Sequence, residues 1–249
     1  MLRRIHTPAL RAGETVALDP AAAHHARDVL RLTIGTEVEL FDDAGATAVG
    51  RISDAGPRGV MVVVDAVTST TDAGPSLTIA SAVPKGERAD WMVEKLSELG
   101  VARFIPLAAA RSVVLPEGKN KRERWQRIAT ESAKQSRRRG VMRIDPLATL
   151  DDAIAAAAGA TGRWVLSTTA DATPVAELVR AATSGSERAS LAMFVGPEGG
   201  WTTEELAQFT AAGFTGARLT TTILRIETAA IAAAAAVGVL AASAPTRVS

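Results

Sequence analysis

The chain has 249 residues, 28 lysines and arginines against 27 aspartates and glutamates, and a hydrophobic fraction of 47%. Such a composition predicts a folded protein with a full hydrophobic core and excludes wholesale disorder. Cysteine is absent, which excludes disulfides and thiolate catalysis. Only three histidines occur, which disfavours a metal site built on histidine and a Ser-His-Asp triad. We expect no metal.

The sequence contains no segment typical of secretion or membrane insertion. Its N-terminal stretch, MLRRIHTPALRAGE, carries charges but lacks the apolar core of a signal peptide. The longest apolar run, residues 229–242, is mostly alanine and falls short of the ~20 residues that span a bilayer. We therefore expect a soluble, cytoplasmic protein with no membrane partner.

Residues 1–72 are expected to form a small β-barrel. Turn signals such as DDAG and DAGPRG separate β-rich segments, and a short helix near residues 20–31 interrupts them. The β-rich segments cover residues 16–19, 36–42, 47–53 and 59–67. The stretch STTDAGPS that follows has the composition of a linker.

Residues 73–249 alternate between apolar strands and helices. Strands are predicted at residues 77–83, 103–107, 164–167, 191–196 and 217–220. In the first helix Met92, Leu96 and Leu99 share one face, and Gly100 is placed to end it. Such alternation predicts an α/β domain with a mostly parallel sheet covered by helices on both faces.

A strongly basic segment covers residues 119–139. It contains nine lysines and arginines but only two acids, and Trp125, Ile128, Ala129 and Ala133 form its apolar stripe. One interpretation is a helix that binds a polyanion, and the other is a solvated helix face. Tyrosine is absent and aromatic residues make up 4% of the chain, which disfavours recognition of single strands by base stacking.

The sequence Gly-Pro-Glu-Gly-Gly, residues 196–200, follows the apolar strand LAMFV. Thr202 and Glu205 have the spacing of a capping box, so a helix is expected just after the loop. Ligands of open α/β sheets bind at the carboxyl ends of the strands, and glycines there allow positive φ and a close approach of backbone. Phosphate motifs are absent and Glu198 would repel a phosphate, so we expect an uncharged or cationic ligand. A plain tight turn is the alternative.

Some twenty residues later the stretch LTTTILRIETAAIA, from Leu219, passes from a strand into a small-residue helix. GPEGG followed by ILRIETA resembles the RsmE-type ribosomal RNA uracil-N3 methyltransferases of the SPOUT superfamily. Further blocks agree: HHARDVLRL, GTEVELFD, residues 85–107, RSVV and ESAKQSRR. The resemblance covers nearly the whole chain. One departure is Thr220–Thr222, where the family often has Gly-x-Arg.

The resemblance implies a PUA-like RNA-binding β-barrel in residues 1–72 and a SPOUT methyltransferase domain with a deep trefoil knot in residues 73–249. It implies a homodimer that binds S-adenosylmethionine and methylates N3 of a uridine in small-subunit (16S) ribosomal RNA, free or in the assembled subunit. The cofactor residues it implies are Leu166, Thr168, Gly196, Pro197, Glu198, Gly199, Gly200, Leu219, Ile223, Leu224, Arg225 and Thr228. Leu219, Ile223 and Leu224 are equally compatible with ordinary core positions.

Methylation of uracil at N3 requires a proton acceptor and donors aimed at the ring oxygens, where negative charge develops. Arg138 and Arg225 are the candidate donors. Glu198, Glu131 and Glu227 are the candidate acceptors. Glu131 and Arg138 fall on one helical stripe with Gln135, which could equally be a surface row with a weak ion pair. Glu198 could alternatively hold its own loop through backbone amides.

The predicted RNA contacts are Arg27, Arg31, Lys85, Arg111, Lys121, Arg122, Arg137 and Arg138. His24 and His25 are interpreted as barrel or RNA-contact residues. Two other functions stay open at this point. A nucleotide- or NAD-dependent α/β enzyme lacks its phosphate motif in this sequence. A non-catalytic RNA-binding assembly factor would need only the barrel and the basic helix.

Overall fold

The computed structural model describes residues 2–69, 74–116, 118–184 and 188–242. The chain forms two compact units. The first unit consists of residues 1–72 together with residues 133–141, and the second consists of residues 73–132 and 142–249.

The first unit is built on a five-stranded sheet with the strand order β1-β3-β4-β5-β2. β1 and β3 are parallel, whereas the other pairs are antiparallel. Its elements are β1 (Arg3–His6), β2 (Thr15–Ala17), α1 (Pro20–His24), the π-helix η1 (His25–Val29), β3 (Glu37–Phe41), β4 (Ala46–Gly56) and β5 (Gly59–Ser69). The predicted helix near residues 20–31 is therefore α1 followed by η1, and β1 was not predicted.

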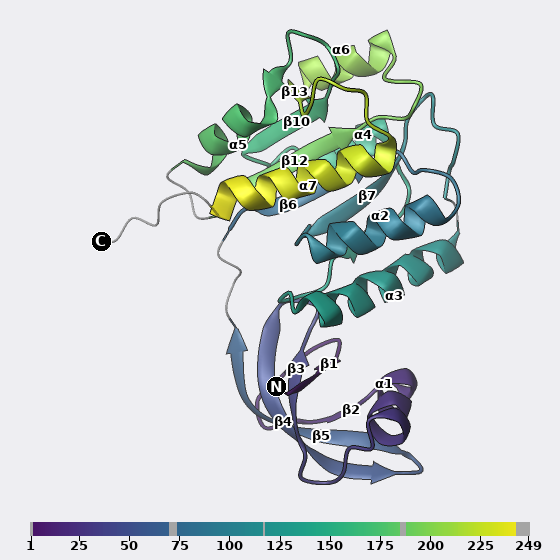
Figure 1. The fold of residues 1–249 in the computed structure, drawn as a ribbon, viewed down its shortest axis with the longest axis vertical. Coiled ribbons are helices and arrows are strands. Elements are labelled where there is room, and N and C mark those ends of the chain that lie inside the picture. The colour runs from purple at the N-terminus through teal and green to yellow at the C-terminus, as the bar shows by residue number, and fades with distance from the viewer. Residues whose placement is uncertain (1, 70–73, 117, 185–187, 243–249) are drawn as a thin grey trace. The chain divides into compact units, whose positions relative to one another are not determined.

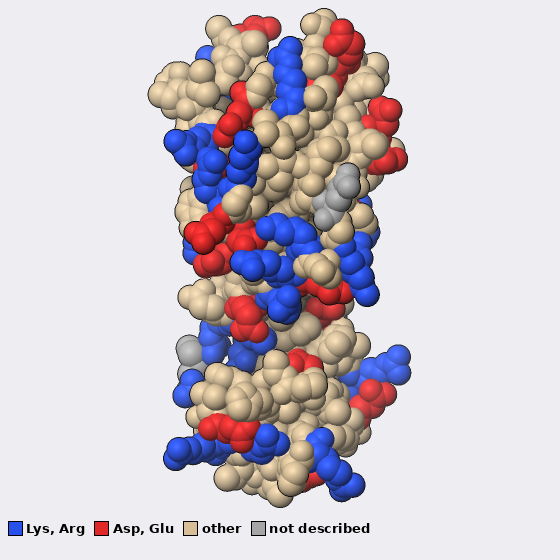
Figure 2. Space-filling model, turned by 90° about the vertical axis from the view of Figure 1, so that its right-hand side faces the viewer, with Lys and Arg blue, Asp and Glu red and all other residues tan. Residues whose placement is uncertain are grey.

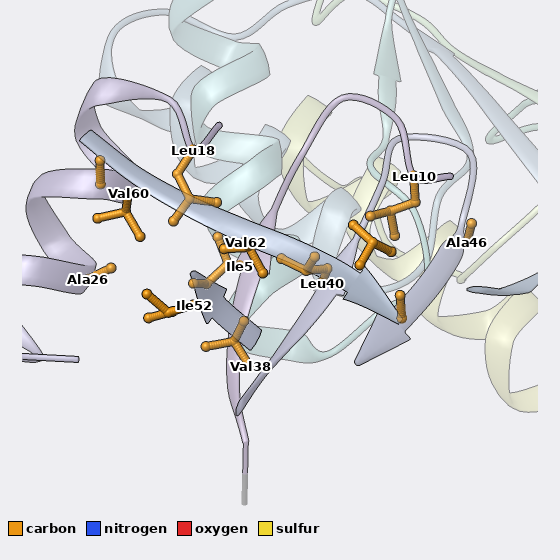
Figure 3. Close-up of a cluster of buried hydrophobic side chains, with 13 residues drawn as sticks. Ile5, Leu10, Leu18, Ala26, Val38, Leu40, Ala46, Ile52, Val60 and Val62 are labelled. Carbon is orange, nitrogen blue, oxygen red and sulfur yellow. The ribbon is translucent and has the colours of Figure 1, made fainter. Parts of the chain in front are cut away.

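The core of the first unit comes from the alternating apolar residues of its strands. Val38, Leu40, Ile52 and Val62 are almost fully buried in one cluster (Figure 3). Asp42, also buried, fixes the turn between β3 and β4 because its carboxylate accepts hydrogen bonds from two backbone amides. The turn chemistry and the strand alternation therefore specify the same sheet.

The second unit is built on a larger sheet with the strand order β11-β13-β10-β12-β6-β7-β8, and β9 pairs with β7. All its strand pairs within the described residues are parallel. The strands are β6 (Ser76–Ser81), β7 (Arg103–Ala108), β8 (Arg143–Ile144), β9 (Ala148–Thr149), β10 (Gly162–Leu166), β11 (Thr173–Pro174), β12 (Ser190–Val195) and β13 (Thr215–Arg218). The predicted parallel sheet is confirmed. The short strands β8, β9 and β11 were not predicted.

Helices cover both faces of this sheet (Figure 1). They are α2 (Glu87–Glu98), α3 (Lys119–Ser136), α4 (Leu150–Ala156), α5 (Val175–Thr183), α6 (Thr203–Ala211) and α7 (Ile226–Ala242). α4 and α6 share one core cluster, in which Phe194 of β12 packs edge-to-face against Phe209 and Phe214. α7 packs against β6 and β12 and lies between α2 and α5, so these three helices form one layer. None of the helices in the described residues is both long enough and apolar enough to cross a bilayer.

Helix α2 ends at Glu98, one residue before the end of its predicted apolar stripe. Met92 and Leu96 are fully buried as expected, but Leu99 is 38% exposed. Gly100 has a φ of +82°, the left-handed conformation that ends a helix, so the predicted stop is confirmed. Leu99 therefore lies outside the buried face because it belongs to the cap of the helix.

Candidate active site

Three loops of the second unit enclose a cavity of about 820 Å³. The loops follow β10, β12 and β13, which are neighbours in the sheet. Because these strands are parallel, their carboxyl ends lie at the same edge (Figure 1). This edge is where open α/β sheets bind ligands, and the volume lies within the range of small-molecule sites.

The glycines of residues 196–200 have different conformations. Gly200 has a φ of +70°, whereas Gly196 and Gly199 do not have positive φ. The amide of Gly200 donates to the carbonyl of Pro197 at 2.9 Å and closes a tight turn. The loop therefore does contain a turn that requires glycine, but the residue that needs positive φ is Gly200.

Gly196 is required for a different reason, the close approach of Trp201. A Cβ on Gly196 would lie 2.8 Å from the Trp201 ring, closer than real contacts allow. The indole Nε1 of Trp201 donates to the carbonyl of Leu166 at 3.3 Å. Trp201 thus connects the loop after β12 to the end of β10, and both segments line the cavity.

The segment after β7 fixes the other side of the glycine loop. Arg111 Nη1 donates to the carbonyl of Gly199 at 2.8 Å. The buried carboxylate of Glu205 accepts hydrogen bonds from the amides of Thr202 and Ala110, both at 2.8 Å. The predicted capping box is confirmed, and its glutamate also binds a second loop.

The wall after β13 is held by a local side-chain turn. Thr220 Oγ1 donates to the carbonyl of Thr222 at 2.8 Å and accepts from the Thr222 amide at 3.3 Å. Among the described residues, positive φ at non-glycine positions occurs only at Arg31 and Arg137. The threonines that replace the usual glycine therefore take ordinary backbone conformations, since their hydroxyls supply the turn contacts.

Few charged side chains line the cavity, and these are Arg88, Glu198 and Arg225. Arg88 Nη1 lies 3.3 Å from Glu227 Oε1 and 3.9 Å from Glu198 Oε1. The Glu227 side chain is buried at 6% exposure, whereas that of Glu198 is 59% exposed. The pocket is thus mainly backbone and apolar side chains, with one carboxylate and two guanidinium groups at its surface.

Two family profiles match the chain. A profile of the RNA methyltransferase domain matches residues 72–238, and one of the RNA methyltransferase PUA domain matches residues 18–65. The chain belongs to this RNA methyltransferase family. The family predicted from the sequence is confirmed, together with the α/β fold and the PUA-like N-terminal part.

Similar proteins with names agree with this assignment. Ribosomal RNA small subunit methyltransferase E of Mycobacterium bovis is 34% identical over 233 residues, which cover 92% of this chain and 87% of that protein. The Bacillus subtilis protein of the same name is 31% identical, over 90% of this chain and 89% of its own length. The crystal structure of this enzyme from Neisseria gonorrhoeae, bound to S-adenosyl methionine, is 28% identical. It superposes with a TM-score of 0.79 over 96% of this chain and 98% of that one.

In this RNA methyltransferase the cavity gathers most of the predicted cofactor residues. Its lining includes Leu166, Thr168, Gly196, Pro197, Glu198, Gly199, Gly200, Leu219, Ile223, Leu224 and Arg225. Thr228, in the first turn of α7, does not belong to the lining. Two lining residues that sequence reasoning missed are Arg88 and Trp201. Both lie in or beside stretches that carried the resemblance, but no local pattern there showed that their side chains face a cavity.

Three candidate catalytic residues, Glu131, Arg138 and Glu227, lie outside the lining. Glu131 is an exposed residue of α3 in the second unit, and Arg138 follows the end of α3 in the segment that belongs to the first unit. Of the five catalytic candidates, the cavity therefore brings together Glu198 and Arg225.

Asp90 of α2 neutralises part of the basic helix α3. Its carboxylate lies 3.1 Å from Lys121 Nζ and 2.6 Å from Arg124 Nη2, and Trp125 Nε1 donates to it at 2.8 Å. Burial raises the pKa of Asp90, but the hydrogen bonds from Trp125, Lys121 and Arg124 outweigh it and leave the pKa below its usual value. Lysines and arginines still gather at the height of α3 on the face in Figure 2. Arg122 of α3 is exposed.

The remaining predicted RNA contacts differ in how they are held. In the first unit, Arg27 donates to Asp28 and holds the pKa of that carboxyl at about 2. Arg137 lies 3.4 Å from Glu39, and Arg31 is exposed. In the second unit, Lys85 is exposed and precedes α2. Arg27 and Arg137 therefore have structural partners, whereas Arg31 and Lys85 are exposed cations.

Proposed function

We propose that this protein transfers a methyl group from S-adenosylmethionine to N3 of a uridine in small-subunit (16S) ribosomal RNA. The observation that carries the proposal is the cavity at the carboxyl ends of β10, β12 and β13. Family membership supports it, because similar proteins are named ribosomal RNA small subunit methyltransferase E, one of them solved with S-adenosyl methionine. The N3 position and the uridine come from the resemblance in the sequence.

The residues present fit this cofactor. The glycine loop presents backbone N–H and C=O groups, and Leu166, Leu219 and Leu224 provide apolar walls for an adenine. Glu198, the one carboxylate in the lining, suits the positive charge of a sulfonium. When bound, the cofactor supplies an electrophilic methyl group. The loops would hold it, since Trp201, Arg111 and Glu205 fix their backbone.

The chain must also accept the N3 proton and stabilise charge on the uracil oxygens. Glu198 is our preferred acceptor because it lines the cavity, and Arg225 is a donor there. Glu227 is less suited, since its side chain is buried and outside the lining. Glu131 and Arg138 stay candidates that the RNA or a second subunit would have to bring to the reaction. Each of these roles is part of the proposal.

We assign RNA binding to the PUA-like residues 1–72 and the basic helix, and methyl transfer to residues 73–249. The exposed cations Arg31, in residues 1–72, and Arg122, in the basic helix, support this division. We further propose that the protein acts in the cytoplasm as a homodimer and that the loops around the cavity form a trefoil knot. These features follow from the resemblance to the family.

Calorimetry on the full chain tests the cofactor directly. We expect S-adenosylmethionine to bind at one site per chain, and NAD to show no binding because a phosphate-binding motif is absent. Binding of NAD without binding of S-adenosylmethionine would reject the proposal in favour of a nucleotide-dependent enzyme. Binding of neither, with RNA binding retained, would favour a non-catalytic RNA-binding factor.

A further inference from the structure

Arg88 is a cation of the cavity wall whose side chain is held by a hydrogen bond to Glu227. It lies in the first turn of α2, and its side chain is 38% exposed. Its Nη1 contacts Glu227 Oε1 at 3.3 Å, in a hydrogen bond between residues 139 positions apart. The pair thus connects α2 to the start of α7 beside the cavity.

The hydrogen bond to Glu227 uses only the Nη1 nitrogen of the guanidinium. Among the described parts of the chain, the hydrogen bond of Arg88 to protein is the one through Nη1. Nε and Nη2 keep their N–H groups for other acceptors, and the residue lines the cavity. A guanidinium held at one corner presents a planar fork that fits two oxygens at once.

Glu227 is well placed to hold this cation. Its side chain is 6% exposed, and it lies in the first turn of α7, where the helix dipole favours a negative charge. Its Oε2 is buried and has no hydrogen-bond partner among the described residues. A buried carboxylate with so few donors depends strongly on Arg88, so the pair resists separation.

Arg225, the other guanidinium in the lining, is exposed, and its side chain has no hydrogen bond or ion pair with the described residues. Ordering such a side chain on binding costs conformational entropy, whereas Arg88 is already oriented. Preorganised donors are the more effective ones in binding sites and in catalysis. This difference makes Arg88 the better oriented of the two guanidinium donors of the cavity.

We propose that Arg88, positioned by Glu227, binds anionic oxygen of the ligand in this cavity. The proposal rests on the proposed function. Two sources carry such oxygen: the carboxylate of S-adenosylmethionine, whose two oxygens fit the planar fork, and one ring oxygen of the target base, on which negative charge develops as the N3 proton leaves. The two sources share one chemistry, a planar group with partial or full negative charge.

The test compares two ligands on the full chain by calorimetry, S-adenosylmethionine and 5′-methylthioadenosine, which lacks the amino-acid part. If Arg88 binds the carboxylate, Arg88→Ala weakens the affinity for S-adenosylmethionine by about 10- to 100-fold and leaves the affinity for 5′-methylthioadenosine unchanged. The double variant Arg88→Ala/Glu227→Gln should show the same pattern while leaving no stranded buried carboxylate. Arg180→Ala, an exposed arginine of α5 outside the cavity lining, is the matched control.

If the base oxygens are bound instead, both ligands keep their affinity in the double variant. Single-turnover methylation at saturating RNA and cofactor then falls by about 10²–10³, the usual effect of losing one such donor. An equal loss of affinity for both ligands would overturn the proposal, since Arg88 would then only stabilise the shape of the cavity. Unchanged affinities together with an unchanged rate would overturn it as well. If the unmodified chain binds neither ligand, the proposed function itself fails.

The role of Glu227 is tested by a double-mutant cycle. Glu227→Gln alone should reproduce part of the Arg88→Ala effect, because the guanidinium loses its charged anchor. In the Arg88→Ala background the same change should add nothing, since there is no cation left to position. An additive effect would show that Glu227 acts independently of Arg88 and would remove it from the proposal.

Discussion

The glycines of residues 196–200 give a graded prediction, because each is replaced by alanine at a different physical cost. A Cβ at Gly196 would lie 2.8 Å from Trp201, a rigid ring. Overpacking of this kind costs about 1–3 kcal/mol. Displacing the indole would also lose its hydrogen bond to Leu166, worth about 1 kcal/mol. Gly196→Ala should therefore destabilise the fold by about 2–4 kcal/mol.

The two neighbouring glycines provide matched controls in the same loop. A Cβ at Gly200 has no neighbour within 4 Å, but its φ of +70° costs an L-residue about 1–2 kcal/mol. A Cβ at Gly199 would approach Arg111 Cβ at 3.2 Å, a tight contact that a shift of a few tenths of an ångström relieves. We expect the order of destabilisation Gly196→Ala, then Gly200→Ala, then Gly199→Ala.

Urea unfolding and calorimetry with S-adenosylmethionine measure the two consequences of these changes. The loss of affinity should follow the same order, because Trp201 and the tight turn shape the cavity. Equal stability of the Gly196→Ala and Gly199→Ala proteins would refute the steric reasoning. A stable Gly196→Ala protein with normal affinity would show that Trp201 does not set the shape of the site.

Three further predictions concern charged residues. Arg122→Ala with Arg127→Ala should weaken RNA binding and flatten its salt dependence by up to about one unit of slope per contact; an unchanged slope would mean that this face of α3 is only solvated. Asp90→Asn should lower the unfolding midpoint at pH 7, measured by the fluorescence of Trp125 and the other tryptophans. The pKa of Asp90 is lower in the folded state, so its contribution to stability is present above the unfolded pKa of ~3.9 and is lost as the pH falls through the folded pKa. The difference in unfolding midpoint between the variant and the unmodified protein should therefore shrink in acid. A difference that stays constant with pH would contradict this. Glu205→Ala should leave two backbone amides without their acceptor and destabilise the fold by about 1–3 kcal/mol in thermal unfolding, and a neutral effect would show that water replaces the carboxylate.

Much of the second unit could be predicted because its signals are local. Apolar runs identified its longer strands, and Gly100 and the capping box of Thr202 and Glu205 identified helix ends. The strands that were missed have two to four residues, too few for a hydrophobic period to be visible. The π-helix η1 was missed for a related reason, since it continues α1 without a change in composition.

The site was only partly predictable, because its decisive contacts join distant parts of the chain. The loop residues could be identified from glycine and from the resemblance, whereas the Arg88–Glu227 pair spans 139 positions and leaves no periodic pattern. Local sequence also could not decide which glycine takes positive φ, since any of the three could. The basic charge of α3 was visible, but its neutralisation by Asp90 depends on the packing of α2.

The central claim is tested most directly by identifying the nucleoside that the protein makes. Small ribosomal subunits or their RNA from cells lacking this activity would be incubated with the full chain and isotope-labelled S-adenosylmethionine. The RNA would then be digested to nucleosides and analysed by mass spectrometry. We predict labelled N3-methyluridine at one site, absent when Gly196→Ala protein is used. Label in another nucleoside, or no label although the cofactor binds, would contradict the account.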